Sequence, residues 1–388
     1  MERKNLILFS DAECPFMDYD IEQECFIGLQ DVKMIFRSIV VNKKTNTKEK
    51  QYMVLTTKYL FSCFDKPVKQ LQKLVFTPQR RITLRWCKFS SRINKDDEGN
   101  LKYLKIKIKG STEMLILYLK KWKNYTKLEK HLRYLAINND FKEKYKILET
   151  IERKDNRILF RLGEHQIDRE FFGKCYLKCH INNMETVKRI RNNIVNLSLL
   201  RDTVNVVNLV DVIETKSEIW IITEFIKGKK LIEKNKKYDH EELKLISKKL
   251  LSLVSFLKKR KLVVRDLNPN RILLTSSKLG LDINSIKITS LSFACFENQS
   301  GISINGCDEI CYMAPEIIFK RKVCFASSIL DMYSIGLILL ECLTGVSIKD
   351  LLAGERGLSL LQKRMKVSID LLSKYKANRG KLNSSFFY

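Results

Sequence analysis

The sequence predicts an α+β protein of two domains, a strand-rich one followed by one in which strands and helices alternate. Its 388 residues exceed the length of one typical domain. From Asp31 to about Phe89, short apolar runs separated by polar joints have the pattern of strands. After about Lys142 the pattern changes to alternating helical and strand-like stretches, which continue to the C-terminus.

Composition places the chain among globular proteins. Hydrophobic residues make up 45% and aromatic residues 10%, and 14 Gly and 5 Pro argue against low-complexity tails. The formal charge of +28 gives a positive field that attracts anionic membranes or nucleic acid. The 11 cysteines are scattered without a Cys-x-x-Cys pair, which indicates reduced thiols and no metal site. We expect a cytoplasmic protein without a signal peptide or membrane span, since the longest apolar run is interrupted by Asp331.

The first domain is expected over residues 31–138, after an N-terminal segment of residues 1–30. Strand patterns come first, in "KMIFRSIVV", "KQYMVLTTKYLFSCF", "KLVFTPQRRITLRWCKF" and "LKYLKIKIKGSTEMLILYLK". A helix follows, because Tyr125, Leu128, Leu132 and Leu135 recur at helical spacing. The order predicts five to seven strands closed by one helix.

That order, together with "KEKQYMVLTTKYLFSCFD", resembles a pleckstrin homology domain. The resemblance implies a β-barrel with a C-terminal helix and a basic loop that binds phosphoinositide headgroups or anionic membrane. The residues that this implies for the headgroup are Lys43, Lys44, Lys48 and Lys50. The sequence departs from the family at its tryptophan in the closing helix, because Trp122 falls too early.

The second domain, expected over residues 142–388, contains "VVRDLNPNRILL", "YMAPEII" and "DMYSIGLILLECLTG" in that order. These stretches resemble the catalytic loop, the end of the activation segment and the following helix of protein kinases. The resemblance implies a bilobal fold with a β-rich N-lobe and a helical C-lobe. It also implies that "DREFFGKCYLKCHI" is the third strand of the N-lobe. Further along the chain, it places Thr223 at the gatekeeper position and residues 224–226 in the hinge.

The N-lobe departs from the family at the parts that hold nucleotide. Charged Glu152, Lys154 and Arg157 stand where a glycine-rich loop should cradle the phosphates. Lys178 matches the nucleotide-binding lysine, and Tyr176 replaces the small residue above the adenine. A competing register makes Lys174 the strand lysine and Phe172 the residue above the adenine.

The helical glutamate that should hold the lysine is also missing. Counting back from "TVNVV" places that position at Asn193 or Ile194. The nearest upstream acid, Glu185, lies eight residues further away, which is about 12 Å along a helix.

The C-lobe keeps the family base and loses its metal ligands. Asp266 matches the base of the catalytic loop, and Asn268 replaces the lysine after it. Arg271 stands at the metal-binding asparagine, and Ser290 replaces the metal-binding aspartate in "KITSLSFACF". A guanidinium and a neutral hydroxyl are poor ligands for Mg²⁺.

The scaffold residues of the family remain. Ala314, Pro315 and Glu316 close the activation segment, and we expect Glu316 to pair with Arg379 and Asp331 to cap the following helix.

These departures predict a pseudokinase that serves as a scaffold or regulator for another signalling protein and uses no cofactor. Two alternatives stay open. One is a divergent serine/threonine kinase that uses ATP and Mg²⁺ weakly. The other is a charge-driven adaptor at the surface of a membrane or on nucleic acid, although nucleic acid is not the expected partner.

Overall fold

A computed structural model describes most of the chain. The described residues are 17–18, 25–42, 47–56, 59–78, 80–84, 87–95, 101–109, 114–138, 141–154, 156–165, 168–181, 183–201, 203–232, 237–277, 280–298, 309–319, 327–355 and 357–384. They divide into two compact units, which we describe separately. The first comprises Met1–Asn182 and Leu209–Glu224, and the second Asn183–Asn208 and Phe225–Tyr388.

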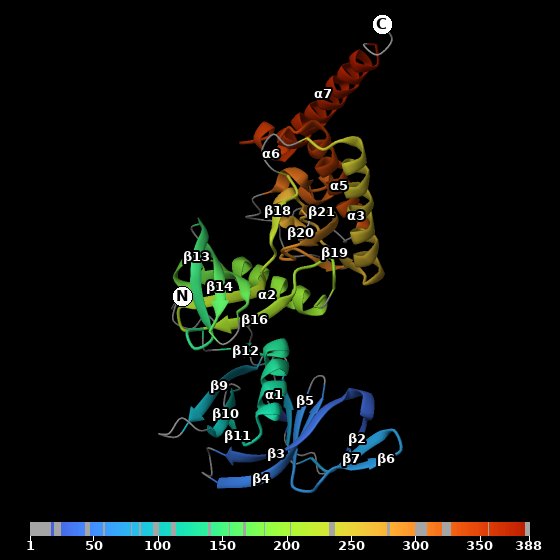
Figure 1. Ribbon diagram of the computed structural model, residues 1–388. Helices are drawn as coiled ribbons and strands as arrows, with labels where there is room; N and C mark the ends of the chain where they lie inside the picture. Colours follow the sequence, from blue (N-terminus) through green and yellow to red (C-terminus); the bar gives the residue numbers. More distant parts are fainter. Residues whose placement is uncertain are drawn as a thin grey trace. The chain divides into compact units, whose positions relative to one another are not determined.

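The first unit contains most of the strands (Figure 1). In chain order they are β1 (Met17–Asp18), β2 (Cys25–Gly28), β3 (Val32–Asn42), β4 (Thr47–Thr56), β5 (Tyr59–Cys63), β6 (Val68–Gln70), β7 (Lys73–Phe76), β8 (Arg80–Thr83), β9 (Lys88–Lys95), β10 (Leu101–Lys109), β11 (Met114–Leu119), β12 (Ile137–Asn138), β13 (Tyr145–Lys154), β14 (Arg157–Glu164), β15 (Glu170–Leu177), β16 (Leu209–Glu214) and β17 (Glu218–Glu224). One helix, α1 (Trp122–Leu135), follows β11, and two short 3-10 helices are η3 (Leu29–Asp31) and η4 (Lys178–His180).

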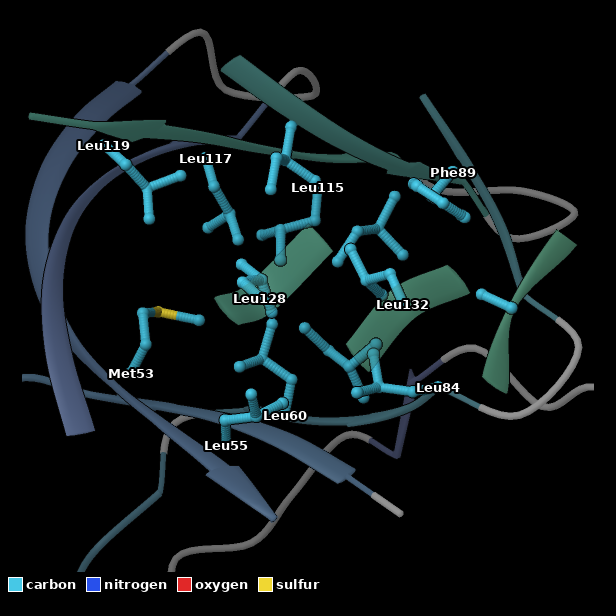
Figure 2. Close-up of a cluster of buried hydrophobic side chains, with 14 of the residues drawn as sticks. Met53, Leu55, Leu60, Leu84, Phe89, Leu115, Leu117, Leu119, Leu128 and Leu132 are labelled. Atoms are coloured by element: carbon cyan, nitrogen blue, oxygen red, sulfur yellow. The ribbon is translucent and has the colours of Figure 1, made fainter. Parts of the chain in front are cut away.

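Most of these strands form one sheet in the order β1-β8-β5-β4-β3-β11-β10-β9-β12-β16-β17-β15-β14-β13. Its first part, through β9, is antiparallel and curves around a core of leucines, which Figure 2 shows with Met53 and Phe89. Helix α1 places Tyr125, Leu128 and Leu132 in this core. The helix that the spacing of these residues predicts is therefore confirmed.

A second layer covers the outer face of β4 and β5. It is a three-stranded sheet in the order β2-β7-β6, and residues such as Leu74 and Phe76 pack there against Val54 and Phe61. The sequence pattern predicts five to seven strands for the first domain. The described part has more, since residues 73–89 alone hold β7, β8 and the start of β9. Pro78 between β7 and β8 lacks the N–H that a continuous ladder needs.

The described residues show no closed barrel for the first domain. In the described part no ladder joins β8 to β9, and β9 instead pairs with β12. Strand β12 runs parallel to both β9 and β16, so it links the two parts of the long sheet. The resulting fold is mixed α+β.

Ion pairs support this junction. Lys144 Nζ lies 2.9 Å from Glu129 Oε1 on α1, and Arg133 Nη1 lies 2.9 Å from Glu164 Oε1 at the end of β14. The five strands β13–β17 have their own core, in which Phe141 stacks on Trp220 at 4.0 Å between ring centroids.

The second unit is mainly helical. Its helices are α2 (Met184–Leu199), α3 (His240–Lys259), α4 (Pro315–Phe319), α5 (Ser328–Thr344), α6 (Ile348–Leu351) and α7 (Gly357–Ser384), with short 3-10 helices η5 (Pro269–Arg271) and η6 (Ile310–Tyr312). Its strands are β18 (Gly228–Lys230), β19 (Leu262–Val263), β20 (Ile272–Ser277), β21 (Gly280–Ile288) and β22 (Cys295–Phe296).

Local sequence explains where its main helices begin and end. Asp239 and Glu242 form a capping box at the start of α3. Gly345 ends α5 with a left-handed backbone, at φ 68°, that suits glycine. Among the described helices of the chain, none is long and apolar enough to cross a membrane.

Candidate functional site

The segment between β19 and β20 holds Asp266 with both carboxylate oxygens engaged. Arg271 Nη2 forms an ion pair with Oδ2 of Asp266. Asn268 Nδ2 lies 2.9 Å from Oδ1 on the other side. Asp266 is 1% exposed, so the carboxylate is removed from water and bound within its own loop. Three positions that the sequence singled out are thus brought together.

Asp331, in the first turn of α5, is hydrogen-bonded to the backbone of this loop. Its Oδ2 and Oδ1 accept hydrogen bonds, each 2.8 Å long, from the backbone N–H groups of Val264 and Arg265. These bonds fix Arg265 at φ 65°, an uncommon conformation for a residue with a side chain. Burial raises the pKa of Asp331 to about 6. The expectation that Asp331 caps its own helix is wrong, because Ser327 does so by accepting from Ile329 N–H.

Ser290 packs against α2 and is hydrogen-bonded there to Asn193. Asn193 Oδ1 accepts from the Leu291 N–H at 2.7 Å and from Ser290 Oγ at 3.3 Å. Ser290 Oγ also lies 2.9 Å from Ser292 Oγ. The sequence singled out Asn193 and Ser290 separately, as replacements of a helical glutamate and a metal-binding aspartate. The fold makes them partners.

Two further asparagines of α2 complete this clamp on the 290–294 segment, and sequence reasoning missed them. Asn192 Nδ2 donates to the carbonyls of Ser292 at 2.9 Å and Ala294 at 2.7 Å, and Asn196 Nδ2 donates to Ala294 at 3.2 Å. Their spacing of four residues puts them on one face of the helix, which is the signal that could have found them.

In the first unit, Lys178 lies just beyond β15, as the first residue of η4. Its Nζ is 2.8 Å from Oε1 of Glu214, while Lys88 Nζ is 3.0 Å from Oε2 of the same carboxylate. The side chain of Glu214 is 1% exposed, so the two lysines balance a buried charge. Glu214 was not identified from the sequence.

Strand pairing bears on which lysine lies within β15. Lys174 is opposite Ile221, and Phe172 is opposite Thr223, the residue before Glu224 at the end of β17. Tyr176 lies further along, is buried, and is opposite Ile219. Lys174 therefore lies within β15, and Lys178 lies in the turn that follows the strand.

The turn between β13 and β14 carries charged side chains in place of glycines. Glu152 pairs with Leu159 in the ladder, and Lys154 Nζ lies 3.5 Å from Glu152 Oε1. Two register shifts interrupt this ladder, at residues 147–149 and 150–152. Because these positions carry side chains, their backbone cannot be approached as closely as that of a glycine-rich loop.

Glu316 of α4 was expected to pair with Arg379. The arginine found near it among the described residues is Arg364. Arg364 is 1% exposed, and its Nη1 donates to the carbonyls of Cys311 at 2.9 Å and Met313 at 2.7 Å. Burial lowers its pKa, and nearby Glu316 contributes in the opposite direction. The side chain of Arg379, the expected partner, lies outside the described residues.

The lysines expected to bind headgroups lie apart from these positions in the chain. Lys48 and Lys50 are exposed on β4, whereas Lys43 and Lys44 lie outside the described residues. Over the described part, no group of three or more His, Cys, Asp or Glu side chains is placed to hold a metal ion.

Comparison with known proteins identifies the family. The model of the protein kinase domain matches residues 159–379, which is more than half of the chain. The chain belongs to the protein kinase family. The loop with Asp266 and the segment with Ser290 both lie inside the matched residues of this kinase domain.

Two relatives show how distant the kinase similarity is. CBL-interacting serine/threonine-protein kinase 21 of Arabidopsis thaliana is 27% identical over 143 residues, 36% of this chain and 32% of that protein. Serine/threonine-protein kinase atg1 of Dictyostelium discoideum is 31% identical over 147 residues, 36% of this chain and 21% of that protein. The chain thus spans about a third or less of the length of these curated relatives.

Proposed function

We propose that this member of the kinase family is a pseudokinase, which does not transfer phosphate and acts in the cytoplasm as a scaffold or regulator of another signalling protein. One observation carries the proposal: Arg271, which the kinase resemblance matches to a metal-ligand position, forms an ion pair with Asp266. A carboxylate in this state is held by a cation and is not free to accept a proton from a substrate hydroxyl. In this proposal Asp266 supports the loop.

The residues at the metal positions do not fit Mg²⁺. The ion requires oxygen ligands in near-octahedral geometry. Arg271 brings positive charge to one position, and the hydroxyl of Ser290 at the other is neutral and bound to Asn193. Neither Mg²⁺ nor ATP is therefore part of the proposed function.

A thermal shift with ATP, with and without Mg²⁺, tests the proposal alongside a phosphate-transfer assay on a generic protein substrate. We expect no shift and no transfer. Saturable nucleotide binding together with transfer that Asp266→Asn abolishes would refute the proposal. Asp239→Asn, at the start of α3, is the matched control for loss of a carboxylate.

A divergent serine/threonine kinase is the second candidate. It is favoured by the retained Arg265 and Asp266 and by the names of both relatives. The same assays decide it, because an active enzyme must show Mg²⁺-dependent binding of ATP.

A third candidate is an adaptor that attaches to anionic membranes through its first domain and its net positive charge. The pleckstrin homology resemblance, the charge of +28 and exposed Lys48 and Lys50 support attachment to anionic or phosphoinositide membranes. Vesicle sedimentation at two salt concentrations tests it. Charge-driven binding falls as salt rises, whereas selective headgroup binding resists salt. Nucleic acid is not the expected partner.

A further inference from the structure

A groove of about 1050 Å³ opens on the outer face of the first unit, and we call it the basic groove. It lies over β3 and β4 and is bordered by the residues before and in β6 and by the start of α1. Its described lining contains six basic residues and no acidic one. They are Arg37, Lys50, Lys66, Lys69, Lys120 and Lys121.

The basic side chains come from separate segments that the fold brings together. Arg37 is on β3 and Lys50 on β4. Lys66 and Lys69 lie on either side of Pro67 and Val68, and Lys121 directly precedes α1. All are exposed at the rim of the groove. Like charges that converge in this way repel one another, and an anionic occupant relieves that repulsion.

Between these cations the groove is lined by aromatic and aliphatic side chains. Arg37 lies over the ring of Tyr52 at 5.1 Å, and Tyr118 lines the groove beside Ile39. Val68 is 56% exposed at the border. A fully polar headgroup would leave this apolar lining uncovered, whereas a peptide can cover it with apolar side chains.

We propose that the basic groove binds an acidic peptide segment of a partner protein, with its carboxylates at the six cations and its apolar side chains on Tyr52, Tyr118 and Ile39. Size agrees, since about 1050 Å³ exceeds the roughly 300–1,000 Å³ that small-ligand sites span and leaves room for a peptide. The inference deepens the proposed scaffold function and rests on it, because it names the chemistry of the partner.

The test is fluorescence anisotropy with the full chain and a labelled peptide of alternating glutamate and leucine. The groove variant carries Lys66→Glu and Lys69→Glu. The matched control carries Lys127→Glu and Lys130→Glu, which make the same charge change on exposed residues of α1 outside the groove lining. We expect the groove variant to bind roughly tenfold more weakly or worse. The control should stay within about twofold of the original chain.

Two peptides and one vesicle assay sharpen the result. Polyglutamate should bind more weakly than the glutamate-leucine peptide, and a glutamine-leucine peptide should not bind. If the groove variant and the control variant both bound the peptide equally weakly, net charge would explain the binding and the proposal would be overturned. The proposal would also be overturned if the original chain bound phosphatidylserine vesicles but no peptide, and the groove variant lost the vesicle binding. The groove would then be a membrane-binding site.

Melting curves exclude misfolding as the cause of weak binding. The anisotropy assay contains no nucleotide, so it fails or succeeds separately from the ATP assays that test the proposed function.

Discussion

Arg271 and Asp266 form an ion pair within the short segment between β19 and β20. The guanidinium and Asn268 hold the carboxylate from two sides, and the carboxylate is almost fully buried. A buried ion pair contributes little net stability compared with apolar residues, but loss of one partner leaves an uncompensated charge. The pair is therefore a sensitive place for substitution.

Arg271→Ala should lower the free energy of unfolding by about 3–5 kcal/mol, because it removes the guanidinium that neutralises the buried Asp266 carboxylate. Urea denaturation at neutral pH measures the change. Arg271→Ala combined with Asp266→Asn removes both charges and should regain much of the loss. A loss below about 1 kcal/mol in the single variant would contradict the pairing.

Asn193→Ala should loosen the segment that follows Ser290. The substitution removes the acceptor of the Leu291 N–H, and an unsatisfied buried donor costs about 1–3 kcal/mol. Hydrogen exchange of the 290–294 segment should accelerate. Ser198→Ala, on the same helix but bonded only to the Val195 carbonyl, is the control and should leave that exchange unchanged.

The sequence indicated the kinase family correctly, because ordered motifs with fixed spacing over some eighty residues survive the loss of chemical residues. It also located α1, whose apolar residues repeat at helical spacing. Counting along the chain pointed to Asn193, yet it could not give the partner Ser290. That partner lies 97 residues away and depends on how α2 packs.

Strand ends were the weakest part of the prediction. Local pattern does not distinguish Lys174 from Lys178, because both follow apolar residues, and only the pairing of β15 with β17 shows where the strand stops. Likewise, Asp331 has the position of a helix-capping residue in the sequence. Its bonds to Val264 and Arg265 require the loop to fold over α5.

Lys178→Met should destabilise the first unit, because it removes one of the two lysines that neutralise the buried Glu214 carboxylate, and the other, Lys88, is 33% exposed. We expect a loss of about 1–3 kcal/mol in chemical denaturation. Glu214→Gln added to Lys178→Met should cost less than the sum of the two single changes. A coupling energy near zero in this double-mutant cycle would show that the two side chains do not interact.

Asp331 should make stability depend on pH. Burial raises its pKa from 3.8 to about 6 in the folded chain, so folding favours the protonated acid. The stability from this group is fully present below the unfolded pKa of 3.8 and is lost as pH rises through about 6. Relative to Asp331→Asn, the original chain should therefore lose on the order of 2 kcal/mol between pH 4 and pH 7. Ser327→Ala, which removes a cap without a titrating group, should cost about 1 kcal/mol at both pH values. Urea denaturation at the two pH values measures these differences, and a stability gap between Asp331→Asn and the original chain that stays constant with pH would refute the prediction.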